Sequence, residues 1–86
     1  MKNLIISFRS RDEVYAFTRI LKLNNINNQI INTPSNIGSS CALSIRVEFL
    51  YFKSISNLIQ KLKPKTFLGI YSTSLTTNGN QTIKLM

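Results

Sequence analysis

The chain has no histidine, a single cysteine and only three acidic residues among its 86 residues. Protein metal sites are built mainly from histidine, cysteine and carboxylate ligands, so this composition argues against a metal site, and no cofactor is expected. A single cysteine also excludes an intramolecular disulfide framework. Without a histidine base or a second thiol, the chain lacks the groups that a stand-alone hydrolase or a dithiol oxidoreductase uses.

Long apolar runs are also missing from the start of the chain. The apolar stretch within residues 1–8 is too short for a signal peptide or a membrane span, so we expect no membrane partner. A lone thiol stays reduced in the cytosol, which predicts a cytoplasmic protein. The length and the 43% apolar content predict one small globular domain over residues 1–86.

Positive charge is abundant, with eleven Lys and Arg residues and a net charge of +8. Such a balance favours nucleic acid or another anionic surface as a partner. The cations are spread along the chain without a run of five, however. Solubility or the binding of a small anion is therefore an equally open interpretation of the charge.

The apolar periodicity predicts two helices and four strands, with a fifth strand or a frayed tail at the end. The expected strands are 3–8, 29–32, 42–47, 67–75 and 81–86, and the expected helices are 11–24 and 49–63. Asn78 and Gly79 indicate a hairpin before the last segment, because Asn-Gly tolerates the positive φ of a type I′ turn. In the strand 42–47, alternation places Leu43, Ile45 and Val47 on one face and Ala42, Ser44 and Arg46 on the other.

Both helices carry an apolar stripe that predicts where they pack. The first stripe contains Val14, Phe17, Ile20 and Leu21, and the second contains Ile55, Leu58, Ile59 and Leu62, extended by Tyr51 and Phe52. Ser10 and Glu13 match a capping box, in which each side chain bonds the backbone amide of the other residue. Pro64 stops the second helix.

The order β-α-β-β-α-β predicts an α+β, ferredoxin-like sandwich with one antiparallel sheet and both helices on one face. This topology collects residues that are far apart in sequence at one end of the sheet. They are Arg9, Ser10, Arg11, the loop 33–40, Cys41, Lys61, Lys63 and Lys65.

Cys41 stands where this loop meets the third strand, a position that a partner can reach. The nearby helix N-terminus and cations favour thiolate over thiol and predict a depressed pKa for Cys41, although Asp12 and Glu13 partly cancel the field. The alternative is that Cys41 is a small buried apolar residue. Arg9, Ser10, Arg11, Ser39 and Ser40 are candidates for binding an anion beside the thiol; the alternative is that they are solvated residues of a loop and a helix start.

The segment Thr33-Pro34, the small polar stretch after it, and Ser40 to Arg46 resemble the signature of the selenium/sulfur carrier protein-like family. Family members are small domains with a Thr-Pro segment, a Ser/Gly-rich turn and a cysteine that opens a strand. The resemblance implies that Cys41 carries sulfur or selenium, as a persulfide or a selenosulfide, without turnover of its own. It implies a sulfur or selenium donor enzyme and an acceptor protein as partners. Ala42 departs from the pattern, since the family usually has glycine there.

Two other functions fit the same sequence. The first is nucleic-acid binding on the open sheet face; the third strand lacks the aromatic pattern that base stacking needs, and Phe8 and Tyr71 are weak substitutes for it. The second is a regulatory or assembly module in which exposed sheet edges pair two chains.

Overall fold

The computed structural model describes residues 3–34, 37, 43–76 and 79–86. Its helices and strands follow one another in this order: β1 (Asn3–Phe8), α1 (Arg11–Leu23), β2 (Asn28–Asn32), β3 (Leu43–Glu48), the 3₁₀ turn η1 (Phe49–Tyr51), α2 (Phe52–Leu62), β4 (Phe67–Thr76) and β5 (Gly79–Lys84). This order confirms the predicted sequence of elements, including the fifth strand.

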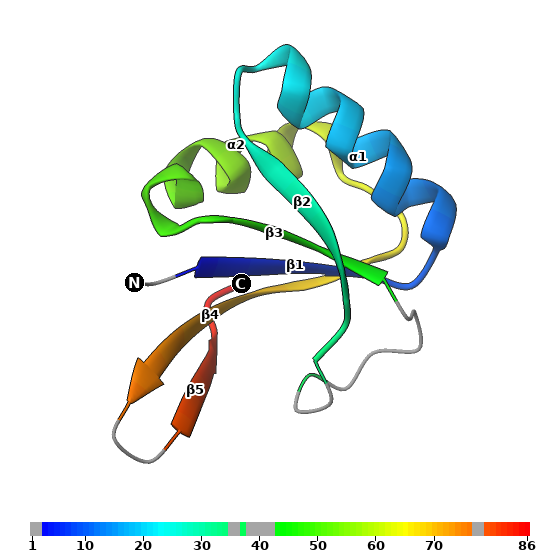
Figure 1. The fold of residues 1–86 in the computed structure, drawn as a ribbon. Helices are drawn as coiled ribbons and strands as arrows, with labels where there is room; N and C mark the ends of the chain where they lie inside the picture. Colours follow the sequence, from blue (N-terminus) through cyan, green and yellow to red (C-terminus); the bar gives the residue numbers. More distant parts are fainter. Residues whose placement is uncertain (1–2, 35–36, 38–42, 77–78) are drawn as a thin grey trace.

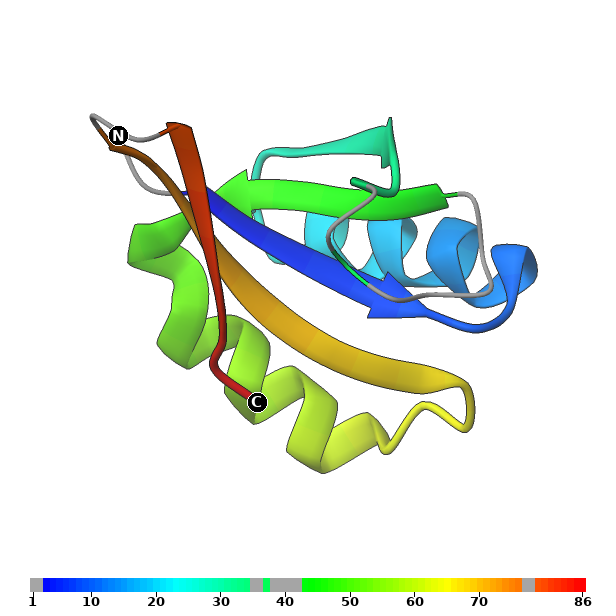
Figure 2. The same ribbon diagram turned by 90° about the horizontal axis from the view of Figure 1, so that it is seen from below.

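The five strands form one antiparallel sheet in the order β2-β3-β1-β4-β5. Figure 1 shows α1 and α2 together on one side of this sheet, and Figure 2 shows the strands from the opposite side. The fold is therefore α+β and compatible with a ferredoxin-like arrangement, extended at one edge by β5. Because β1 is central and antiparallel to both neighbours, its carboxyl end lies beside the starts of β3 and β4.

The core lies between the sheet and the two helices. It is formed by alternate residues of the central strands and by the inner stripes of both helices: Leu4, Ile6, Phe8, Val14, Phe17, Leu21, Ile26, Ile45, Val47, Ile55, Ile59 and Ile70. The Phe8 ring packs against Phe17 and Phe67, with centroids 5.4 Å and 6.0 Å away. The predicted stripe of the first helix and the predicted inner face of β3 are thus confirmed, with Ile20 and Leu43 partly buried at the core's margin.

The second helix differs from its prediction at both ends. Residues 49–51 form a 3₁₀ turn instead of the first helical turn, and Phe49 stacks on Phe52 there with ring centroids 6.2 Å apart. At the other end Lys63 has φ 48°, a left-handed conformation that stops the helix immediately before Pro64. Leu62 is 44% exposed, so its assignment to the buried stripe was wrong.

The C-terminal hairpin is confirmed by the pairing of Thr76 with Gly79. The two residues between them, and with them the predicted turn geometry, lie outside the described residues. After β5 the chain bends towards α2, where the Ser56 hydroxyl donates to the Met86 sulfur (Figure 2). The Met86 carbonyl also accepts the Ile70 amide, so the last residue is held against β4.

The open face of the sheet, opposite the helices, contains a buried polar row. Ser7, Ser44 and Gly69 lie side by side on β1, β3 and β4, and the two serines are fully buried. The Ser44 and Thr33 hydroxyl oxygens are 2.7 Å apart and share a hydrogen bond, whereas the buried Ser7 hydroxyl has no hydrogen-bond partner among the residues that the structure describes. Ser44 thus has the predicted outward orientation but does not offer its side chain to solvent.

The two serines are expected to respond differently to replacement by alanine. Ser44→Ala should lower the free energy of unfolding by about 1 kcal/mol, because the Thr33 hydroxyl loses its buried partner. Ser7→Ala should leave stability unchanged or raise it by up to about 1 kcal/mol, because a desolvated hydroxyl without a partner is removed. Urea unfolding of both variants measures this difference, and equal losses in the two would contradict the described hydrogen bonding.

Candidate functional site

The end of the sheet where β1 stops is held together by Thr66, in the connection between α2 and β4. The Thr66 carbonyl accepts the Arg9 amide at 2.7 Å, and the Thr66 hydroxyl oxygen accepts the Ser10 amide at 3.3 Å. The Thr66 amide and hydroxyl both donate to the Glu13 carboxylate, the amide at 2.7 Å. We call this group of Arg9, Ser10, Glu13, Lys65 and Thr66 the Thr66 junction.

Glu13 therefore has a different role from the predicted one. Ser10 occupies the N-cap of α1, but the helix has no side-chain cap hydrogen bond, so the capping box was wrong. The Glu13 carboxylate instead accepts the Thr66 donors and the Lys65 amide, the latter at 3.2 Å. Several donors outside the helix hold this carboxylate more strongly than the single amide of Ser10 could.

The same contacts change the acidity of Glu13. Desolvation alone would raise the pKa of its carboxyl group, but the hydrogen bonds from Thr66 and Lys65, together with the Lys65 charge, lower the pKa below its usual value. Glu13 is thus ionised at neutral pH and is engaged with backbone donors. Neutral donors do not cancel its negative charge, and Asp12 is a second carboxylate in the same helical turn, so both offset part of the positive charge at this end.

The junction brings several cations to one end of the sheet. Arg9 and Arg11 flank the start of α1, Lys63 and Lys65 flank the α2–β4 connection, and all four side chains are exposed. The backbone bond between Arg9 and Thr66 places these two segments side by side. Lys61, in the last turn of α2, also lines a cleft of about 320 Å³ beside that helix, together with Asn24 and Tyr51.

Cys41, Ser39 and Ser40 lie outside the described residues, as does Ala42. The structure does describe the start of β3, to which this segment is joined. β3 begins at Leu43, and the pairing of Ser44 with Ser7 puts that beginning beside the end of β1. Two residues of chain span at most about 7 Å, so covalent connection alone keeps residue 41 within that distance of Leu43.

The sheet face offers little for stacking nucleic-acid bases. Phe8 is fully buried in the core on the helix side, so it cannot contact a base on the open face. Tyr71 pairs with Ile5 and does face the open side, but it is half-buried and stands alone there among the aromatic residues that the structure describes. Of the two residues predicted to stack on bases, Phe8 is excluded and Tyr71 remains.

Two structural features concern metals and membranes. The described part of the chain contains no group of three or more His, Cys, Asp or Glu residues arranged to bind a metal ion. Neither of the two helices described is long and apolar enough to cross a bilayer.

A comparison with known protein families gives a match over residues 3–72, to the family described as "Putative Se/S carrier protein-like". The chain belongs to this family. The match runs from the first strand to the middle of β4 and includes Cys41, which confirms the resemblance found in the sequence. No curated protein and no solved structure matches the chain.

Thr66 was not among the residues that the sequence predicted for this site. The residue follows Pro64-Lys65 in a short polar connection, and its partners Arg9, Ser10 and Glu13 are more than fifty residues away. The one indication of its role was the predicted fold, which places the end of the second helix beside the start of the first.

The lowered pKa of Glu13 makes the junction sensitive to acid. A carboxylate whose pKa is lower in the folded than in the unfolded state stabilises the fold at neutral pH, and this contribution is lost as the pH falls below about 4. Glu13→Gln should therefore reduce the free energy of unfolding by about 1–2 kcal/mol at pH 7. The difference from the parent should shrink below about pH 4.

Asp12→Asn provides the matched control, because Asp12 is an exposed carboxylate in the same helical turn. Chemical unfolding across a pH series measures both variants. A loss that is equal for the two substitutions, or that persists unchanged in acid, would contradict the described bonding of Glu13.

Proposed function

We propose that this protein is a sulfur or selenium carrier that holds the transferred atom on Cys41. The observation that supports the proposal is the family match, which spans the chain's sole cysteine. The partners would be an enzyme that donates sulfur or selenium and a protein that accepts it. A reducing compartment such as the cytoplasm suits this role, because the thiol has to stay free between transfers.

The proposed transfer is a thiolate exchange. The Cys41 thiolate attacks the terminal sulfur of a donor persulfide, R–S–SH, so that a bond forms between Cys41 Sγ and that sulfur. The donor's S–S bond breaks, and the donor leaves as the thiolate R–S⁻. The terminal sulfur keeps its oxidation state, so no external oxidant is required. The selenium analogue, R–S–SeH, would leave Cys41 as a selenosulfide in the same way.

The cations beside the Thr66 junction suit this chemistry. A thiolate and a persulfide anion are both stabilised by neighbouring positive charge and by the N-terminus of a helix. Arg9 and Arg11 are exposed at the start of α1, where Glu13 accepts hydrogen bonds from Thr66 and Lys65 and Asp12 is exposed. We assign Arg9, Ser10, Arg11, Ser39 and Ser40 to holding the anionic group during exchange.

Mass spectrometry of the intact chain tests the proposal directly. After incubation with a low-molecular-weight persulfide and removal of the excess, the parent chain should gain the mass of one sulfur atom, and Cys41→Ser should gain nothing. Subsequent addition of a thiol acceptor should remove the added atom. No adduct on Cys41 with any of several persulfide donors would contradict the carrier function.

The rate of the same reaction tests the role of the cations. Arg9→Gln combined with Arg11→Gln should slow sulfur transfer by about fivefold, because two charges that favour the thiolate are lost. Arg19→Gln combined with Lys53→Gln removes the same charge from exposed positions within the helices and should change the rate less than twofold. Equal slowing in both pairs would show that only net charge matters.

A further inference from the structure

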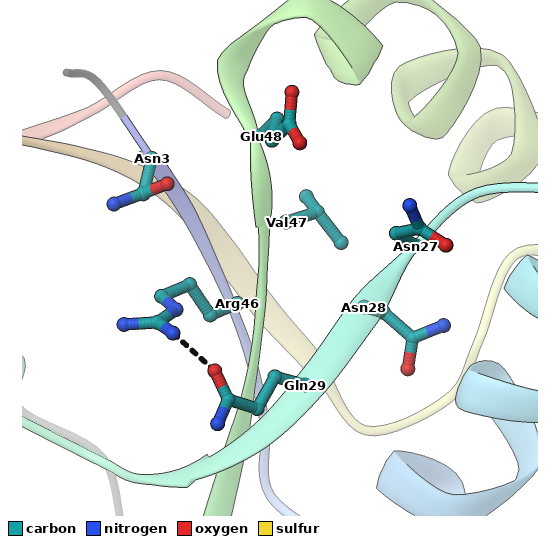
Figure 3. Close-up of a pocket in the computed structure, with 7 residues that line it drawn as sticks. All are labelled: Asn3, Asn27, Asn28, Gln29, Arg46, Val47 and Glu48. Carbon is teal, nitrogen blue, oxygen red and sulfur yellow. Dashed lines mark hydrogen bonds between the residues drawn. The ribbon is translucent and has the colours of Figure 1, made fainter.

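The opposite end of the sheet carries a cleft rich in side-chain amides. A cleft of about 520 Å³ lies where the start of β2, the end of β3 and the start of β1 meet, and is lined by Asn3, Asn27, Asn28, Gln29, Arg46, Val47 and Glu48 (Figure 3). A second cleft of about 330 Å³ is lined by Lys22, Asn25, Ile26, Asn27 and Asn28. Because the two share Asn27 and Asn28, they form one continuous surface, which we call the Asn27 cleft.

The amides of this cleft are largely available to a ligand. Asn27 is exposed, and neither its side chain nor that of Asn25 has a hydrogen-bond partner in the part of the chain that the structure describes. Asn25 adopts a left-handed conformation with φ 59°, which turns the chain between α1 and β2. The Asn28 side chain donates one bond to the Ile26 carbonyl at 3.1 Å, and its carbonyl oxygen remains an acceptor.

The two cations of the cleft keep their charge. Figure 3 shows Arg46 of β3 reaching across to Gln29 of β2, where its guanidinium donates to the Gln29 side-chain oxygen. That oxygen belongs to a neutral amide, so the contact orients the guanidinium without cancelling its charge. Lys22 is exposed at the last turn of α1, on the other side of Asn27 and Asn28. Glu48 is the one carboxylate among the lining residues; it is the cross-strand neighbour of Asn3 and lies on the same face of β3 as Arg46.

We propose that the Asn27 cleft binds single-stranded nucleic acid, with Lys22 and Arg46 contacting phosphates and the Asn27, Asn28 and Gln29 amides hydrogen-bonding base edges. Side-chain amides present a donor and an acceptor side by side, the pattern that base edges complement. The net charge of +8 favours a polyanionic ligand over a neutral peptide.

The adjacent face of α1 would extend this surface. Tyr15, Arg19 and Lys22 follow one another at intervals of four and three residues, so they share one side of the helix. All three are exposed, and the Tyr15 ring is 45% accessible. An exposed aromatic ring beside cations is the arrangement on which unpaired bases stack. The Asn27 cleft itself lies at the end of the sheet opposite the Thr66 junction, so the proposal does not depend on sulfur transfer.

Fluorescence anisotropy with labelled oligouridylate and oligoadenylate RNA tests the proposal on the reduced full chain. We expect saturable binding that persists at about 0.15 M salt. Lys22→Gln combined with Arg46→Gln should weaken it at least tenfold, whereas Lys53→Gln with Lys61→Gln, an equal loss of charge on α2, should weaken it less than threefold. Asn27→Ala should cost about fivefold without any change in charge, and Asn57→Ala, on α2, should cost nothing.

Thermal unfolding followed by circular dichroism establishes that each variant is folded before its affinity is compared. Three results would overturn the proposal: no binding at that salt concentration, equal weakening by the two charge pairs, or equal affinities of Asn27→Ala and the parent. Equal weakening would mean attraction by net charge alone. Tighter binding of duplex than of single-stranded RNA would also overturn it, because paired bases do not expose their edges to the amides.

Discussion

The hydrogen bonds between Thr66 and the start of the first helix are the constraint on which the arrangement of this small domain depends. Thr66 binds the Arg9 and Ser10 amides and donates twice to Glu13, so one residue of the α2–β4 connection holds the β1–α1 turn. An exposed loop loses conformational entropy when it is ordered, and the hydrogen bonds of Thr66 offset this loss for the α2–β4 connection. The junction also satisfies backbone amides at a helix start that has no side-chain cap.

The two ends of the sheet differ chemically. At one end, the exposed Arg9, Arg11 and Lys65 outnumber the carboxylates Asp12 and Glu13, so the charge is positive where β1 stops and β3 begins. At the other end, the turn between α1 and β2 presents neutral amides between two cations. The proposed carrier function requires recognition by other molecules as well as reaction with them, and two separate surfaces would allow both.

Most of the architecture could be predicted from local patterns. The bounds of β1 match the prediction, and α1 ends one residue earlier than expected, because alternation, helical period and the asparagines at 24–28 are local signals. The family resemblance likewise rested on a contiguous segment. What the sequence could not show depends on contacts between distant residues: Glu13 appeared to cap its own helix until its partners at positions 65 and 66 were visible. Leu62 was assigned wrongly for the same reason, and the burial of Ser44 could not be predicted, since periodicity assigns a residue to a face but does not show what covers that face.

The proposed sulfur transfer requires the sole thiol to lie beside the cationic end of the sheet. Paramagnetic relaxation by a nitroxide attached to Cys41 measures this proximity, and no other cysteine has to be removed. We expect the strongest loss of amide signal at Arg9, Ser10 and Arg11, with the signals of Asn25 and Asn27 largely unaffected. Stronger broadening at Asn25 and Asn27 than at residues 9–11 would contradict it.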